Sequence, residues 1–203
     1  MAACAQTLTP VVIEAGGKDA LIVDADADLA AAADAALWAG MSNAGQTCIG
    51  TERVYVHEKV FEPFMEELTQ RARALRPGYE DGAAYGPATM PSQLDIIRRH
   101  VEDAIARGGR AVVGGPDAID DRYVWPTILT HVPEDSAAVT EETFGPVLVV
   151  NPVASMEEAV ERTNATSYGL AGAVFGRRNA EQIARDIRSG MTSVNSVISF
   201  AAV

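Results

Sequence analysis

The sequence predicts an α/β fold in which helices cover both faces of an open, mostly parallel, twisted sheet. Short apolar runs rich in β-forming residues alternate with longer segments of helical periodicity along the 203-residue chain. Hydrophobic residues make up 48% of the chain, which is enough for a substantial core. Because parallel neighbours need a crossover connection, the strand–helix alternation favours a parallel sheet over a meander.

The amino-terminal half predicts three strands and two helices. An acidic residue, Asp26, precedes the alanine-rich helix and is a candidate N-cap. The expected strands are Pro10–Glu14, Ala20–Val23 and Arg53–His57, and the expected helices are Ala27–Met41 and Val60–Leu75.

The carboxyl-terminal half continues the same alternation. Ser92 and Ser155 stand where helices are expected to begin, and a further helix is expected between the last two strands. The expected helices are Ser92–Arg107 and Met156–Asn164, and the strands are Ala111–Gly115, Tyr123–Thr130, Pro146–Val150, Ala171–Phe175 and Thr192–Ser196.

Residues 1–203 are expected to form one domain. The Gly- and Pro-containing stretches 76–91 and 116–122 have the composition of loops, not of a domain linker. The chain opens with a strand-like run and closes on the apolar stretch SVISFAAV, which has no polar tail. We therefore expect this domain to be a piece of a longer enzyme.

Charge and composition argue against several classes of protein. A formal net charge of −12 without a basic patch argues against nucleic-acid binding and against anionic lipid surfaces. No apolar run approaches the ~20 residues that span a bilayer, and the start lacks a secretory signal, so a cytoplasmic protein is expected. No metal site is expected, because the cysteines and histidines are scattered: Cys4, Cys48, His57, His100 and His131.

Cys48 lies in a loop that glycines flank on both sides. The loop Ser42–Gly50 connects the alanine-rich helix to the next strand, and its glycines let the backbone approach a ligand closely. A thiolate at a sheet edge would be a strong nucleophile toward a carbonyl carbon. Taken alone, the loop favours the alternative that Cys48 is a small buried apolar residue, which is what a lone cysteine more often is.

Glu14 follows an apolar run and precedes Gly16–Gly17–Lys18. If the run is a strand, the carboxylate stands at its carboxyl end, where acids and bases of α/β enzymes are commonly found. The alternative is an exposed ion pair between Glu14 and Lys18, which would contribute at most about 1 kcal/mol.

Together these segments resemble the aldehyde dehydrogenase superfamily. Glu-Ala-Gly-Gly-Lys is similar to the family's Glu-x-Gly-Gly-Lys segment, and Gly-Gln-Thr-Cys is similar to its Gly-Gln-x-Cys loop, with Glu14 and Cys48 separated by 34 positions. Glu142-Thr-Phe-Gly-Pro146 is similar to the Glu-x-Phe-Gly-Pro segment that contacts the nicotinamide ribose. Asn195, after a short strand, resembles the asparagine before the family's substrate-facing loop.

The resemblance implies an NAD- or NADP-dependent oxidation of a small aldehyde to a carboxylic acid. Cys48 would form a thiohemiacetal and then a thioester, and Glu14 would activate the hydrolytic water. By the same resemblance, the cofactor would contact Glu142, Phe144 and Gly16. The substrate would contact residues of the cysteine loop and of the carboxyl-terminal segment, namely Gln46, Thr47, Ile49, Asn195 and Phe200.

The resemblance covers the family's catalytic domain only. The cofactor-binding half and the terminal strand through which family subunits assemble into homo-oligomers have no counterpart here, so the chain alone is expected to have little or no turnover. Ala15 and Asp19 depart mildly from the usual pattern. Two alternatives stay open: a cofactor-independent thiol esterase or acyl-phosphate reductase relative, and a non-catalytic scaffold that keeps the fold.

Overall fold

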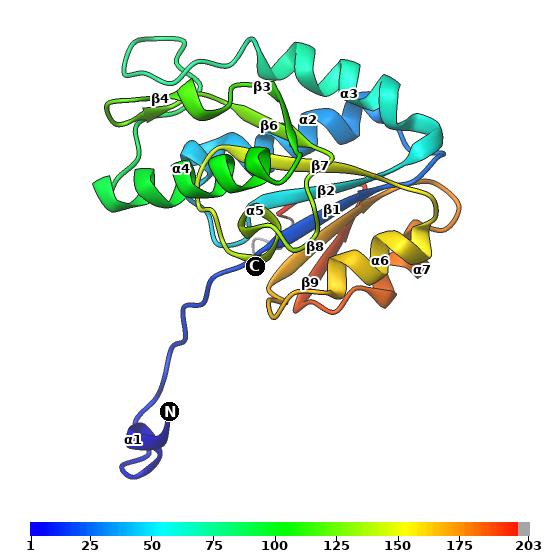
Figure 1. The fold of residues 1–203 in the computed structure, drawn as a ribbon. Helices are drawn as coiled ribbons and strands as arrows, with labels where there is room; N and C mark the ends of the chain where they lie inside the picture. The colour runs from blue at the N-terminus through cyan, green and yellow to red at the C-terminus, as the bar shows by residue number, and fades with distance from the viewer. Residues whose placement is uncertain (199–203) are drawn as a thin grey trace.

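A computed structural model describes residues 1–198 and shows a seven-stranded mixed sheet with helices on both faces (Figure 1). The strands are β1 (Asp19–Val23), β2 (Thr51–His57), β3 (Arg110–Val113), β4 (Ile119–Asp120), β5 (Tyr123–Val124), β6 (Thr127–Thr130), β7 (Val147–Val153), β8 (Ala171–Phe175) and β9 (Met191–Val194). The helices are α1 (Ala2–Ala5), α2 (Leu29–Met41), α3 (Glu58–Ala72), α4 (Pro91–Ala106), α5 (Ala137–Thr140), α6 (Met156–Asn164) and α7 (Ala180–Asp186), with 3₁₀ turns at Ser42–Gly45 and Pro116–Ala118.

The order of strands in the sheet is β3-β6-β7-β2-β1-β8-β9. Every neighbouring pair is parallel except β3 and β6, and the short strands β4 and β5 form a separate antiparallel pair. The predicted fold class is confirmed. β1 and β2 lie at the centre, so the loops that precede them open at the middle of one sheet edge.

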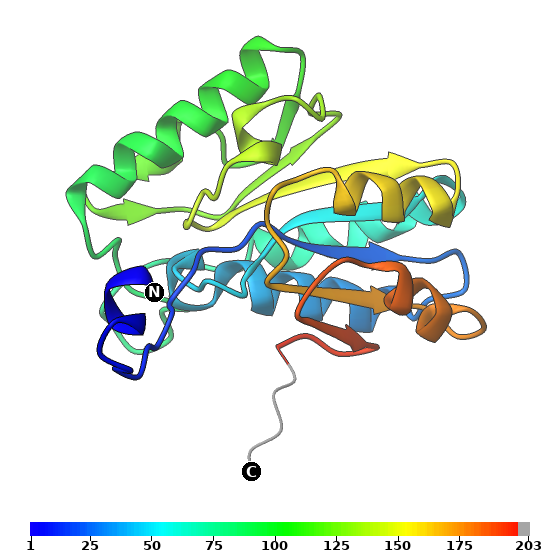
Figure 2. The same ribbon diagram turned by 90° about the horizontal axis from the view of Figure 1, so that it is seen from below.

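The core consists of two apolar layers, one on each face of the sheet. Successive strand residues point to opposite faces, so Leu21 and Val23 pack against α2 and α3, whereas Ile22 packs against α6 and α7. A third cluster joins α4 and α5 to β6 and β7 through Ile97 and Leu129. Figure 2 shows α2 and α3 on one side of the sheet and α6 and α7 on the other.

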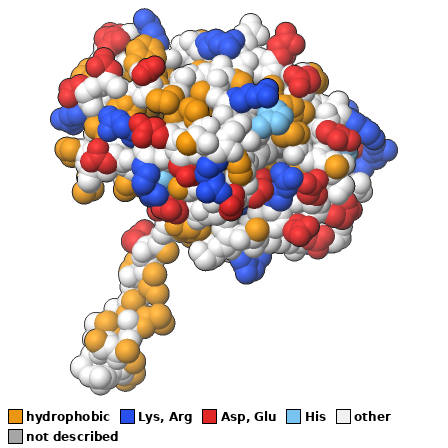
Figure 3. Space-filling model, viewed as in Figure 1, with side chains coloured by type: hydrophobic (Ala, Val, Ile, Leu, Met, Phe, Trp, Pro, Cys, Tyr) orange, Lys and Arg blue, Asp and Glu red, His pale blue; other side chains and the backbone are white. Residues whose placement is uncertain are grey.

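Residues 10–14 do not form the predicted strand. They are extended but make no ladder, and their side chains are exposed along an arm that leads away from the domain (Figures 1 and 3). Val12 is 88% exposed and Ile13 is 63% exposed. An apolar run becomes a strand only where a neighbour accepts its hydrogen bonds, and β1 already has β2 on one side and β8 on the other.

Other boundaries follow from local chemistry. Asp28, not Asp26, is the N-cap of α2 and accepts a hydrogen bond from Ala31 N at 3.1 Å. The helix expected from Ser92 begins one residue earlier with Pro91 in its first turn, a position that needs no N–H. Ser155 caps α6 as predicted.

The predicted strand Tyr123–Thr130 is divided into β5 and β6. Pro126 lies between the two parts and has no N–H to donate to a ladder, which explains the interruption. The strand Ala171–Phe175 and the helix Met156–Asn164 have the predicted bounds. Within residues 1–198, no helix combines the length and the apolar character that crossing a membrane requires.

Candidate active site at the amino ends of three strands

Three of the motif segments meet because they precede three adjacent parallel strands. Residues 14–18 lead into β1, residues 42–50 lead into β2, and residues 141–146 lead into β7. The register pairs Asp19 with Thr51 and Arg53 with Val149, so the three amino ends lie at the same edge of the sheet. The expectation that Glu14 follows a strand at its carboxyl end is wrong, because the strand begins only at Asp19.

Two close backbone approaches explain why these segments contain glycine. A Cβ at Gly17 would lie 2.2 Å from the carbonyl oxygen of Cys48, and one at Gly45 would lie 2.1 Å from the carbonyl oxygen of Gly145. Gly45 also has a φ of +70°, a backbone conformation that residues with a side chain rarely adopt. The cysteine loop is therefore packed directly against both of the other segments.

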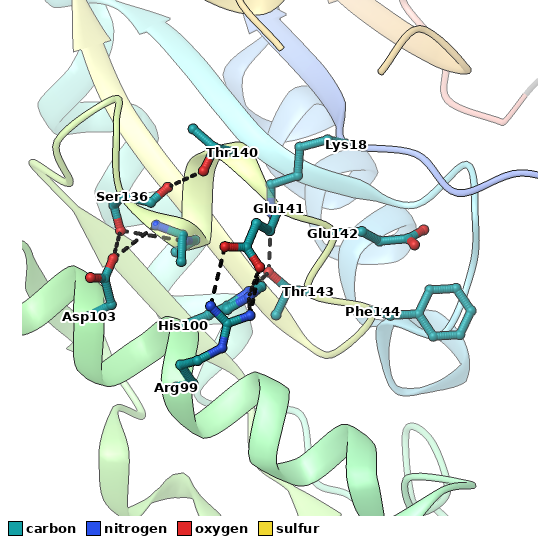
Figure 4. Close-up of polar contacts among 12 residues, drawn as sticks. Lys18, Arg99, His100, Asp103, Ser136, Thr140, Glu141, Glu142, Thr143 and Phe144 are labelled. Carbon is teal, nitrogen blue, oxygen red and sulfur yellow. Dashed lines mark hydrogen bonds and ion pairs between the residues drawn. The ribbon is translucent and has the colours of Figure 1, made fainter. Parts of the chain in front are cut away.

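Glu142 joins the glycine segment to the third loop. Its Oε1 accepts a hydrogen bond from Gly17 N at 3.0 Å, and a Cβ at Gly16 would lie 2.4 Å from its Oε2. Figure 4 shows the side chains of Glu142 and Phe144 pointing to the same side, away from Thr143 and His100. Both side chains are half-buried, so they can contact a ligand.

Lys18 forms a buried ion pair with Glu52, not an exposed pair with Glu14. The same Glu52 carboxylate accepts hydrogen bonds from Thr143 N at 2.8 Å and from Phe144 N at 2.7 Å. Burial lowers the pKa of Lys18, and the attraction of Glu52 opposes that shift. The alternative of an exposed Glu14–Lys18 pair is therefore wrong.

Arg53 holds the backbone directly before β1. Its Nε and Nη2 donate to the carbonyl oxygen of Lys18 at 2.9 and 2.6 Å, and Nη2 also donates to Thr163 O at 3.1 Å. The guanidinium is buried, and its donors are satisfied by these backbone carbonyl groups. Lys18 is thus held at both its backbone and its side chain.

The cysteine loop is shaped by a left-handed turn and by two amide side chains. Asn43 and Ala44 both have positive φ, and Asn43 Nδ2 donates to Gln46 O at 2.9 Å. Gln46 donates through Nε2 to Asn43 O and accepts from Thr89 N at 2.8 Å. Cys48 is half-buried at the end of this turn.

The remaining predicted site residues differ in their surroundings. Thr47 and Ile49 flank Cys48 and are half-buried, whereas Glu14 is exposed. Glu14 precedes Gly17 by three residues, so their Cα atoms are at most about 11 Å apart. Phe200 lies outside the described residues.

The side chain of Asn195 is engaged with the backbone beyond β8. Its Oδ1 accepts from Gly176 N at 3.0 Å and its Nδ2 donates to Gly176 O at 2.9 Å. Asn195 itself has a φ of +51°. These two bonds continue the β8–β9 pairing past the end of the ladder and set the direction in which the chain leaves β9.

Glu52, Thr143 and His100 belong to the site cluster but were not predicted from the sequence. His100 is fully buried, with Nδ1 3.0 Å from Thr143 Oγ1, and burial lowers its pKa, which favours the neutral imidazole. The sequence signal for Glu52 is weak: it stands with Arg53 as a pair of charged residues directly before the apolar residues Val54–Val56. Among residues 1–198, no cluster of potential ligand side chains is arranged to hold a metal ion.

A sequence profile described as the aldehyde dehydrogenase family matches residues 1–203. The chain belongs to this family. Relatives of this aldehyde dehydrogenase family chain include the 4,4'-diapolycopene aldehyde oxidase of Methylomonas sp, 37% identical over 93% of the chain, and the 3-sulfolactaldehyde dehydrogenase of Pseudomonas putida, 36% identical over 95%. The chain spans only 36% and 41% of these two relatives.

Solved structures, aldehyde dehydrogenases among them, share the fold. An NADP-dependent enzyme of E. coli has a TM-score of 0.93 at 32% identity, covering 98% of this chain and 43% of its own. An NAD-dependent aldehyde dehydrogenase from Sinorhizobium meliloti has a TM-score of 0.90 at 34% identity, covering 97% of this chain and 40% of its own. The family fold predicted from the motifs is thus confirmed.

Asp19 should make the stability of the fold depend on pH. It is buried, its Oδ1 accepts from Ala171 N at 3.0 Å, and its Oδ2 has no hydrogen-bond partner among residues 1–198. Burial raises the pKa of Asp19 to about 7 from an ordinary 3.8. Between these values the folded chain keeps a proton that the unfolded chain releases, so stability falls as pH rises, by about 1 kcal/mol per unit.

Asp19→Asn should remove this dependence. Urea unfolding from about pH 5 to about pH 8 is expected to show the variant gaining stability relative to the parent as pH rises. The exposed Asp117→Asn is the matched control and should track the parent. A constant difference between Asp19→Asn and the parent would contradict the assignment.

Proposed function

We propose that residues 1–203 form the catalytic domain of an enzyme that oxidises an aldehyde to a carboxylic acid with NAD or NADP. The observation that supports this best is the meeting of the Cys48 loop, Gly16–Gly17 and the Glu142–Phe144 segment at one sheet edge. The proposed nucleophile loop, the glycines that follow Glu14 and the proposed cofactor-contacting segment are thereby adjacent. Since the chain spans 36–41% of its relatives, turnover is assigned to the longer enzyme.

Cys48 is the proposed nucleophile. Its thiolate adds to the aldehyde carbon, which forms a C–S bond and a thiohemiacetal oxyanion. The half-buried, turn-fixed loop holds the sulfur in one place, so the attack needs little reorganisation. Loss of hydride from that carbon leaves a thioester on Cys48, and hydrolysis returns the thiol and releases the acid.

Glu14 is the proposed general base for hydrolysis. A carboxylate can take a proton from water as the water attacks the thioester carbon. The Gly17–Glu142 and Gly17–Cys48 contacts fix the segment three residues after Glu14, while Glu14 itself is exposed to water. An exposed carboxylate three residues from this fixed point can take its proton from solvent water.

The residues at this edge fit a nicotinamide nucleotide. Glu142 Oε1 is occupied by Gly17 N, but within residues 1–198 its Oε2 has no hydrogen-bond partner and can accept from a ribose hydroxyl. Phe144 presents a half-buried ring on the same side (Figure 4). When bound, the nicotinamide accepts the hydride. Glu142, Phe144 and the side-chain-free Gly16 would orient it.

Thr47 and Ile49 are the proposed contacts to the substrate carbonyl region, since they flank Cys48 and are half-buried. The side-chain amides of Gln46 and Asn195 are hydrogen-bonded to backbone groups. We therefore propose that these two residues shape the loops around the substrate. The named relatives act on chemically unlike aldehydes, a diapolycopene aldehyde and a sulfolactaldehyde. The proposal is therefore limited to the aldehyde group.

Cys48→Ser tests the nucleophile. Hydrolysis of 4-nitrophenyl acetate needs no cofactor, and it should fall by roughly three orders of magnitude because the hydroxyl has no comparable anion at neutral pH. Cys4→Ser, which changes the other cysteine, should leave the rate unchanged. Full activity in Cys48→Ser would contradict the mechanism. Ester hydrolysis in a longer enzyme that never reduces NAD or NADP would favour the cofactor-independent esterase.

Glu14→Gln tests the base. Acylation of Cys48 by the same ester should persist, whereas deacylation should slow about 100-fold or more, so that intact-mass spectrometry detects an accumulated acyl-enzyme. The exposed Glu62→Gln serves as the control and should deacylate like the parent. Equal deacylation in Glu14→Gln and the parent would exclude Glu14 as the base.

A further inference from the structure

Glu52 stands outside the motif segments, yet it contacts two of them. Its carboxylate is buried, with the residue 5% exposed, and it pairs with Lys18 from the glycine segment. The same two oxygens accept hydrogen bonds from the consecutive amides of Thr143 and Phe144. A single side chain at the start of β2 therefore holds the loops before β1 and β7 together.

We propose that Glu52 is a positioning residue that sets the backbone of Thr143 and Phe144, and thereby the placement of Glu142 and Phe144 against a nicotinamide nucleotide. This inference rests on the proposed function. Two adjacent N–H groups that converge on one carboxylate fix the orientation of both peptide planes. Phe144 needs such support, because its φ of +50° lies in a region that non-glycine residues rarely occupy.

Thr143 is held at every polar atom. Its N–H donates to Glu52, its carbonyl oxygen accepts from Gln93 Nε2 at 2.7 Å, and its hydroxyl oxygen accepts from Lys18 Nζ at 3.1 Å. The hydroxyl also contacts His100 Nδ1. Thr143 thus points into the protein as an anchor, and the side chains on either side of it point outward (Figure 4).

The chemistry of a carboxylate suits this role. Two oxygens can serve two amides and an ammonium group at once, whereas a glutamine has only one oxygen to accept with and would turn an NH₂ group toward donors. A buried carboxylate is stable only with its partners in place. The arrangement is therefore complete only when the loops before β1 and β7 are both assembled against β2.

Glu52→Ala and Glu52→Asp test the inference against Glu134→Ala. Glu134 is a matched control, since it accepts from Tyr55, Asn151 and Arg162 away from the three loops. Each variant is measured at the same interval below its own melting temperature. The readouts are amide hydrogen exchange at Thr143 and Phe144 and the dissociation constant for NADH from fluorescence titration.

Glu52→Ala is expected to speed exchange at both amides and to raise the NADH dissociation constant, each by about tenfold or more, as the loss of charge-assisted hydrogen bonds predicts. Glu52→Asp should recover part of both effects, and Glu134→Ala should change neither by more than about twofold. Equal changes in Glu52→Ala and Glu134→Ala would overturn the inference. Faster amide exchange at Thr143 and Phe144 in Glu52→Ala alone would support the positioning of the loop. If the parent protein does not bind NADH, the proposed cofactor role is contradicted.

Discussion

The parallel register of β1, β2 and β7 is the constraint on which the candidate site depends. Adjacent parallel strands place their amino ends at one edge, so three segments far apart in sequence must emerge together. Glycines then allow the backbones to touch, as Gly17 does at the carbonyl of Cys48. The strand order and register of the sheet thus bring the segments together, and the side chains then complete the site.

Buried charge at this edge contrasts with the apolar strand centres. Leu21, Val54 and Val150 are fully buried among hydrophobic neighbours, whereas the strand starts carry Asp19 and Glu52. Burying a carboxylate costs free energy unless it is paired or protonated. Glu52 is paired with Lys18, whereas only one oxygen of Asp19 is hydrogen-bonded and its pKa is raised. Burial of Asp19 therefore costs the fold some stability at the edge where the loops are positioned.

Much of the fold could be predicted because its signals are local. The Ser155 cap and the periodicity of α6 define that helix within the sequence itself. The strand predicted at residues 10–14 was wrong because β-propensity does not reveal whether a neighbouring strand is available for pairing. The role of Glu52 was not predictable, since its partners lie 34 positions before it and 91 positions after it. Motif resemblance supplied the site residues, but only the register shows which ones touch.

The rate of alkylation at Cys48 relative to Cys4 tests the account most directly. Both thiols are half-buried, so exposure alone does not separate them. Limiting iodoacetamide and peptide mass spectrometry report the two rates in the same folded molecule and again in concentrated urea. Cys48 is expected to react faster than Cys4 in the folded chain, and the difference should disappear on unfolding. A Cys48 that reacts no faster than Cys4 when folded would contradict an assembled nucleophile at this sheet edge.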